Sequence, residues 1–295
     1  MDLTAGDNDY LYRFVFEHTQ VRGELVHLDA SWRAALDLHD YPVPVRDLLG
    51  QAMAAATLLS ATIKFEGSLQ LQLQGDGPVS LLLIEVTASR SLRGLAHWSG
   101  EVPDDSLLNQ VGKARLAITI DPGSMGERYQ GVVEVAQDSI AAVLENYFQQ
   151  SEQLATRLWL AADGERASGM LLQRLPGSGT DEEEDWHREV LLGETVTGGE
   201  LLGLTAVELL HRLYHEEDLR LFEPEPVSFR CSCSRERIET MLRGLGYDEM
   251  RDILAEQGSV SVSCEFCNHH YRYDAVDIER LFAAADQPDV PRTRH

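Results

Sequence analysis

The sequence predicts an α+β protein, in which a core built on an antiparallel sheet precedes a helical linker and a small cysteine-containing domain. Three observations support this architecture. Apolar and polar residues alternate along several stretches before residue 175, the composition becomes acidic and glycine-rich over residues 177–185, and every cysteine lies in the last quarter of the chain. We therefore expect three parts, residues 1–178, 179–228 and 229–295.

The chain is expected to begin with strands and then a long helix. Residues 10–28 carry aromatic and β-branched side chains in near alternation, which predicts one or two strands. Asp29 and Ser31 could cap a short helix that ends by Leu38. Residues 45–63 place apolar side chains at helical spacing, which predicts a long buried helix.

The rest of the core is expected to be mainly β-structure. Leu69, Leu71 and Leu73 alternate with glutamines, as in a strand with one buried face. Further strands are expected at residues 79–86, 92–98, 114–120, 129–135, 156–161 and 170–175, with a helix at 139–150. The strands at 114–120 and 129–135 are expected to form a hairpin.

The linker should contain two short helices, residues 186–192 and a second run that ends near Tyr214, divided by residues 195–199. Thr205 and Glu208 have the spacing of a capping box, which starts the second helix there. Its apolar face is formed by Ala206, Leu209, Leu210 and Leu213. Such stripes are usually plain core contacts, so a switching role depends on the neighbouring cysteines.

The cysteines have metal-ligand spacing. Cys231 and Cys233 form a C-x-C pair, and about thirty residues later Cys264 and Cys267 form a C-x-x-C pair. Two close pairs separated by a longer insert are typical of a four-thiolate zinc site. Ordinary buried thiols would be scattered along the chain instead. His269 and His270 could be alternative ligands, but four thiolates already complete the shell.

The net charge, the N-terminal sequence and the absence of a catalytic motif limit the classes of function that we expect for this chain. A formal net charge of −24 disfavours binding to nucleic acid or to an anionic membrane. The N-terminus lacks the basic and apolar regions of a signal peptide, so we expect a cytoplasmic protein whose clustered cysteines bind metal. We find no catalytic motif and expect no enzymatic activity. A zinc-ribbon nucleic-acid binder or scaffold without redox switching is the alternative.

The motifs around the cysteines closely resemble those of the heat-shock protein 33 family, redox-regulated holdase chaperones of bacteria. The resemblance rests on residues 229–237 (FRCSCSRER), on Cys264-Glu-Phe-Cys267 and on the segments 21–25, 72–78, 126–131, 151–154, 212–217 and 253–256. It extends over essentially the whole chain, and the C-x-C and C-x-x-C combination is its most specific part.

The resemblance implies a stress-response chaperone that binds unfolded proteins without ATP when oxidised, as a homodimer, and protects them until they can refold. In the reduced, inactive form the four cysteines would hold one Zn²⁺ per chain. We expect oxidation to form the disulfides Cys231–Cys233 and Cys264–Cys267 and to release zinc. The zinc domain and linker would then unfold and expose apolar surface.

Overall fold

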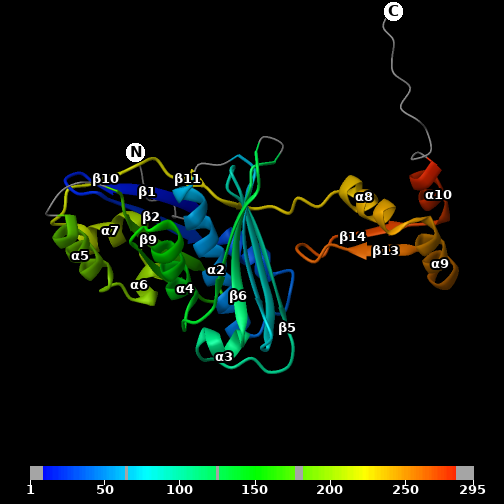
Figure 1. Cartoon of the computed structure of the whole chain (residues 1–295), viewed down its shortest axis with the longest axis horizontal. Coiled ribbons are helices and arrows are strands. Elements are labelled where there is room, and N and C mark those ends of the chain that lie inside the picture. The colour runs from blue at the N-terminus through cyan, green and yellow to red at the C-terminus, as the bar shows by residue number, and fades with distance from the viewer. Residues whose placement is uncertain (1–8, 64–65, 124–125, 177–181, 284–295) are drawn as a thin grey trace, which may run out of the picture. The chain divides into compact units, whose positions relative to one another are not determined.

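The chain forms two compact units, one ending at Arg230 and the other beginning at Cys231 (Figure 1). The computed structural model describes residues 9–63, 66–123, 126–176 and 182–283. Mixed helices and sheets confirm the predicted α+β class. Across the described residues, no helix combines the length and the apolar character needed to span a membrane.

Among the described residues, the first unit contains two six-stranded sheets where the sequence predicted one. The first sheet has the order β10-β1-β2-β9-β8, and β11 also pairs with β1. Its strands are β1 (Tyr10–Phe16), β2 (Val21–Leu28), β8 (Thr156–Ala162), β9 (Ala167–Arg174), β10 (Leu219–Leu221) and β11 (Glu225–Pro226). Alternation identifies a strand but not the sheet to which it belongs, which explains the difference.

The second sheet has the order β12-β5-β4-β3-β6-β7. Its strands are β3 (Ser68–Gly75), β4 (Val79–Thr87), β5 (Ser91–Trp98), β6 (Ala114–Asp121), β7 (Tyr129–Glu134) and β12 (Ser228–Phe229). Leu69, Leu71 and Leu73 are buried, as their alternation predicted. The predicted hairpin is formed by β6 and β7, although residues 124 and 125 of its turn lie outside the described residues.

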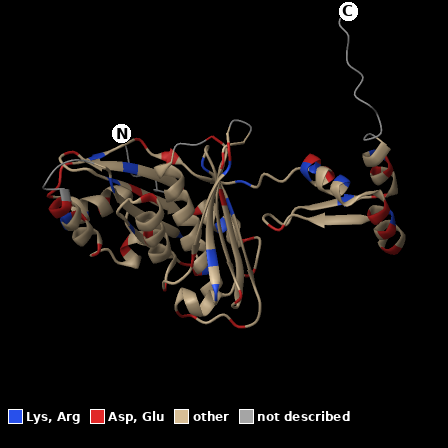
Figure 2. Ribbon diagram, in the orientation of Figure 1, with Lys and Arg blue, Asp and Glu red and all other residues tan. Residues whose placement is uncertain are grey.

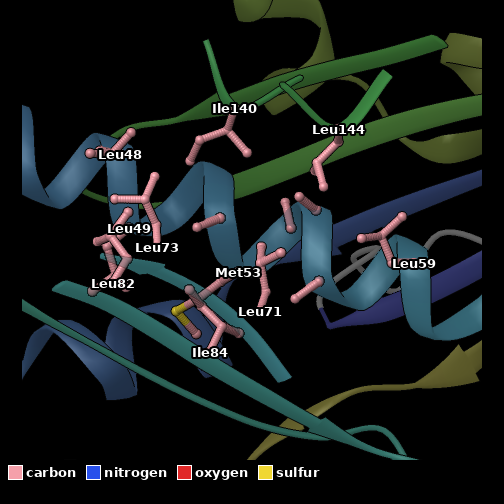
Figure 3. Packing of buried hydrophobic residues seen from close by; sticks show 14 of the residues in the cluster. Leu48, Leu49, Met53, Leu59, Leu71, Leu73, Leu82, Ile84, Ile140 and Leu144 are labelled. Carbon is pink, nitrogen blue, oxygen red and sulfur yellow. The ribbon is translucent and has the colours of Figure 1, made fainter. Parts of the chain in front are cut away.

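The helix α2 (Val43–Thr62) contacts strands of both sheets and forms the centre of the main core. Figure 3 shows Leu49 and Met53 of this helix packed against Leu82 and Ile84 of β4. Ile140 and Leu144 of α4 join the same cluster. The other core helices are α1 (Ala30–Leu36), α3 (Leu107–Val111), α4 (Ile140–Tyr147) and the π-helical turn η2 (Phe148–Glu152).

The side chain of Asp9, not that of Asp29, caps helix α1. Asp29 is the residue at the cap position, but its side chain makes no capping hydrogen bond. The Asp9 carboxylate accepts hydrogen bonds from the backbone N–H groups of Asp29, Ala30 and Ser31. The expected role of Asp29 and Ser31 as side-chain caps is therefore wrong, because a carboxylate from twenty residues earlier takes that role.

Three linker helices, α5 (Glu182–Gly193), α6 (Gly198–Gly203) and α7 (Ala206–Tyr214), contribute to a second apolar cluster with the first sheet. The stripe of Leu209, Leu210 and Leu213 is buried there. It packs with strand residues that include Phe14, Phe16, Leu25, Met170 and Leu172. The linker therefore covers an apolar face of the sheet.

Helix α6 was not predicted, because residues 195–199 were interpreted as a break. Thr197 and Glu200 form a capping box at its start, and Thr205 and Glu208 form the predicted one at the start of α7. The T-x-x-E spacing of Thr197 and Glu200 was the signal that could have located α6.

The second unit is small. It contains α8 (Arg235–Leu245), α9 (Tyr247–Gln257), the hairpin of β13 (Val260–Ser263) and β14 (His270–Tyr273), and α10 (Ala275–Ala283). Its buried apolar cluster consists of Leu242, Met250, Val260, Tyr273, Ile278 and Leu281. A core of this size gives little stability by itself.

Candidate metal centre

Two different local structures position the cysteines. Cys231 and Cys233 lie in the segment between β12 and α8, and Cys264 and Cys267 lie in the turn between β13 and β14. Ser234 ends the first segment as the N-cap of α8, where its hydroxyl accepts a hydrogen bond from the backbone N–H of Arg237. The Arg237 guanidinium donates to the hydroxyl of Ser232, which lies between the two cysteines.

The turn that carries Cys264 and Cys267 is closed by backbone hydrogen bonds. The N–H groups of Cys267 and Asn268 both donate to the carbonyl of Cys264, at 3.3 and 2.7 Å. The Cys264 N–H donates to the carbonyl of His269 at 3.0 Å. Asn268 has a φ of +52°, the left-handed conformation that asparagine tolerates better than most residues. This folded turn brings both sulfurs to the same side of the hairpin.

The four sulfurs form one cluster. All lie within 4.8 Å of one another, with 3.6 Å between Cys231 and Cys264 and 3.4 Å between Cys233 and Cys267. A tetrahedral Zn–S bond of about 2.3 Å would place neighbouring sulfurs about 3.8 Å apart. The donor set and its spacing therefore fit a tetrahedral metal ion.

Electrostatics also favours a cation at this position. Burial raises the pKa of the Cys264 thiol, and burial together with the neighbouring Cys233 sulfur raises that of Cys267. Four thiolates held this close repel one another unless a positive ion lies between them. Without a metal ion the cysteines therefore prefer to stay protonated. A bound metal ion reverses this preference for the protonated form because it binds the deprotonated sulfurs.

Two neighbouring histidines do not join the cluster. The described residues place four cysteines in one metal-binding group, which includes neither His269 nor His270. The His270 ring is 2.6 Å from the Ser263 hydroxyl, and the His269 ring packs against Tyr271.

Sequence patterns missed Tyr271, whose hydroxyl donates to the Cys233 sulfur at 3.3 Å. Tyr271 lies in a short strand, and the sequence pattern there gave no indication that its side chain contacts Cys233, which lies 38 positions earlier.

The second unit has no uniformly basic surface on its described helices. Figure 2 shows acidic and basic residues interspersed on α8, α9 and α10. Several are paired with each other, including Arg235 with Glu239 and with Asp277. A nucleic-acid interface needs a cluster of unpaired basic residues, which this arrangement does not favour.

Comparison with known proteins gives consistent matches over nearly the full length. The family described as Hsp33 protein matches residues 9–274. A 33 kDa chaperonin of Nitrosococcus oceani is 54% identical over 289 residues, covering 98% of this chain and 99% of the relative. A 33 kDa chaperonin of Ectopseudomonas mendocina is 49% identical over 295 residues, covering 98% and 100%. The crystal structure of the 33 kDa chaperonin (HSP33 homolog) of Thermotoga maritima has the same fold, with a TM-score of 0.82, 22% identity and coverage of 94% and 100%.

Fold and site together define a modular α+β protein with a cluster of four cysteines able to hold a metal ion. The chain belongs to the Hsp33 family, whose members are chaperones rather than enzymes.

Proposed function

We propose that this chain is a redox-regulated, ATP-independent holdase whose switch is the cysteine cluster. Family membership supports the chaperone activity. The switch is supported by one observation, which is that all four cysteines of the chain converge within 4.8 Å. Its clients are unfolding proteins in the cytoplasm during oxidative or heat stress, which it protects from aggregation until they refold.

In the off state, Cys231, Cys233, Cys264 and Cys267 hold one Zn²⁺ per chain. Zinc bound in such sites contributes about 10–16 kcal/mol to the fold and keeps its ligand sulfurs deprotonated but masked. The six buried apolar residues that the structure describes in the cluster of the second unit are too few to replace that contribution. Four sulfurs also suit iron, so metal analysis of purified protein distinguishes the two.

Oxidation then removes the ligands. Peroxide converts one cysteine sulfur to a sulfenic acid, and a second sulfur displaces the hydroxyl group to form the S–S bond. Each disulfide consumes two thiolates, one peroxide and two protons from solvent and yields two waters. The pairs Cys231–Cys233 and Cys264–Cys267 would use all four sulfurs, leaving none to hold the ion.

The choice of pairs determines what oxidation does to the fold. Crossed pairs, Cys231 with Cys264 and Cys233 with Cys267, are separated by only 3.6 and 3.4 Å. Crossed disulfides would tie the two halves of the second unit together, whereas local ones leave the halves free. We favour the local pairs because sulfurs two or three residues apart stay close when the unit loosens.

The loss of the second unit's fold can reach the linker along the chain. Three short strands, β10, β11 and β12, connect α7 to the first cysteine and pair with β1 and β5. The N–H of Arg230 donates to the carbonyl of Leu92 in β5, and Cys231 is the next residue. Unfolding that begins at Cys231 would therefore pull first on β12, then on β11 and β10.

Release of the linker would uncover the client-binding surface. Helix α7 and strand β1 belong to one apolar cluster, in which the ring of Tyr214 at the end of α7 lies 5.0 Å from the ring of Phe16 and 6.5 Å from that of Phe14. Separation exposes both the leucine stripe and the aromatic face of the sheet, and such patches bind unfolded chains. The charge of −24 would keep the complexes soluble. The same exposed surface supports the proposed pairing of oxidised chains as homodimers.

The test compares reduced, metal-loaded protein with protein treated with peroxide at mild heat. Metal release is measured with a chromogenic chelator, and suppression of client aggregation is measured by light scattering. We expect one zinc per chain to be lost as suppression appears. Equally strong suppression by the reduced, metal-loaded protein would refute the switch.

A further inference from the structure

The side chain of Tyr271 places a hydrogen-bond donor on one of the four sulfurs. Its hydroxyl donates to the Cys233 sulfur at 3.3 Å, and that sulfur is 3.4 Å from the sulfur of Cys267. Tyr271 lies on β14, which follows the turn that carries Cys264 and Cys267 (Figure 1). The bond thus connects the hairpin to the C-x-C segment beside the cluster.

Packing fixes the position of this phenol. Tyr271 lies opposite Val262 in the β13–β14 register, and both side chains pack against the small apolar core. The His269 ring is 4.6 Å from the Tyr271 ring, in an edge-to-face arrangement of 68°. The donor therefore points at the sulfur before the oxidant arrives, and little side-chain entropy is lost in making the bond.

A hydrogen bond to a ligand sulfur changes its chemistry. It withdraws electron density from the thiolate, so the sulfur attacks oxidants and electrophiles more slowly. It also orients the ligand toward the metal, as outer-shell partners generally do. Both effects act on Cys233 before any disulfide exists.

We propose that Tyr271 is a positioning residue that holds the Cys233 sulfur in the cluster and lowers its reactivity, so that it sets the oxidant threshold of the switch. This inference rests on the proposed metal-bound off state. It concerns one hydroxyl group and one sulfur, and it is separable from the identity of the clients.

The test compares Tyr271→Phe with Tyr247→Phe. Tyr247 is in the same unit and its hydroxyl donates to the Glu279 carboxylate, so the control removes a tyrosine hydroxyl that touches no sulfur. Val262→Ala is a second control, which loosens the same hairpin and keeps the donor. Tyr271→Leu provides another hydroxyl-free variant if the phenylalanine variant folds poorly. All are compared with one Co²⁺ bound per chain, and then with Zn²⁺.

Three measured quantities are expected to change in Tyr271→Phe. The sulfur-to-cobalt charge-transfer band shifts to longer wavelength, because the sulfur loses a donor that stabilised its electrons. Alkylation of Cys233 by iodoacetamide, followed by peptide mass spectrometry, accelerates about tenfold. Zinc release then begins at a lower peroxide concentration. Tyr247→Phe matches the wild type, and Val262→Ala leaves the band in place.

The outcomes separate this inference from the function on which it rests. A wild-type chain that binds no stoichiometric cobalt or zinc contradicts the proposed off state itself. A wild-type chain that binds metal and releases it on oxidation, with an unchanged band and Cys233 alkylation rate in Tyr271→Phe, overturns only the role of Tyr271. An acceleration that appears equally in Val262→Ala without a band shift would assign the effect to hairpin packing and also overturn it.

Discussion

The guanidinium of Arg90 binds the carboxylate of Glu225 and so ties the segment before the cysteine cluster to the core. Its Nε donates to Glu225 Oε2 at 2.9 Å, and its Nη1 donates to the carbonyl and hydroxyl oxygens of Ser60 in α2, both at 2.8 Å. Arg13 binds the other Glu225 oxygen. Glu225 belongs to β11, so this ion pair holds the segment through which we propose that unfolding travels.

Replacement of Glu225 should loosen that segment. Glu225→Ala leaves the largely buried Arg90 without its carboxylate, and we expect a loss of about 1 kcal/mol because the pair is partly exposed. Hydrogen exchange of residues 219–230 should become about fivefold faster, with less peroxide needed for activation. Glu223→Ala, an exposed change on the same segment, is the control. Unchanged exchange in Glu225→Ala would show that the ion pair does not hold the segment.

A side chain at Gly193 should release the linker by a steric clash. A Cβ at this last residue of α5 would lie 2.7 Å from the Trp159 ring and 2.9 Å from the Tyr214 hydroxyl. Gly193→Ala should therefore destabilise linker docking by about 1–3 kcal/mol and give partial aggregation suppression without oxidant. Gly199→Ala in α6 meets no atom within 4 Å and should leave the reduced protein inactive. Identical behaviour of the two variants in the light-scattering assay would contradict the steric argument.

Glu189 should make linker docking depend on pH. This α5 carboxyl is buried, and burial raises its pKa to about 7 even though Thr19 donates a hydrogen bond to it. The nearby negative charges of Glu217 and Asp185 also raise the pKa of Glu189, and the positive charge of Arg188 lowers it. Arg188 is itself paired with both of these carboxylates. Its pKa is raised in the docked state and returns toward 4.5 on release. The stabilisation of docking is therefore complete below about pH 4.5 and is lost as the pH rises through about 7.

The measurement is hydrogen exchange of α5 and α7 in reduced protein between pH 5.5 and 8.5, corrected for the intrinsic pH dependence of exchange. Corrected protection should fall across this range in the wild type. Glu189→Gln, which stays neutral, should keep protection constant and higher at pH 8.5. A wild-type decline that persists undiminished in Glu189→Gln would assign the pH dependence to another group.

Some parts of the structure could be predicted because their signals are local. The alternation of Leu69, Leu71 and Leu73, the capping box of Thr205 and Glu208, and the spacing of the cysteines each depend on residues close in sequence. Local spacing determines which face a side chain occupies or which groups a turn brings together.

Other parts depend on contacts between distant residues. Asp9 caps a helix that begins about twenty residues later, and Ser228–Phe229 adds a two-residue parallel strand beside β5. Tyr271 reaches a sulfur 38 residues away. Strands this short carry no periodicity, and the partner of a hydrogen bond is determined by the tertiary fold, so no pattern in the sequence marks these residues.

Disulfide mapping tests the proposed local pairing. Protein activated with peroxide, alkylated and digested without reductant should yield peptides that link Cys231 with Cys233 and Cys264 with Cys267. Crossed links should be minor, although the crossed sulfurs are separated by only 3.6 and 3.4 Å. Predominantly crossed links in fully active protein would show that activity does not require the two halves of the unit to separate.

Hydrogen exchange of α7 and β1, followed during oxidation, tests the central claim most directly. The claim is that oxidation of the cysteine cluster uncovers the apolar face formed by these elements. We predict that protection of Leu209–Leu213 and Phe14–Phe16 is lost together with zinc and with the onset of aggregation suppression. A variant with all four cysteines replaced by serine should have lost zinc binding and this protection before any peroxide is added. Oxidised wild-type protein that suppresses aggregation while α7 stays fully protected on β1 would contradict the claim.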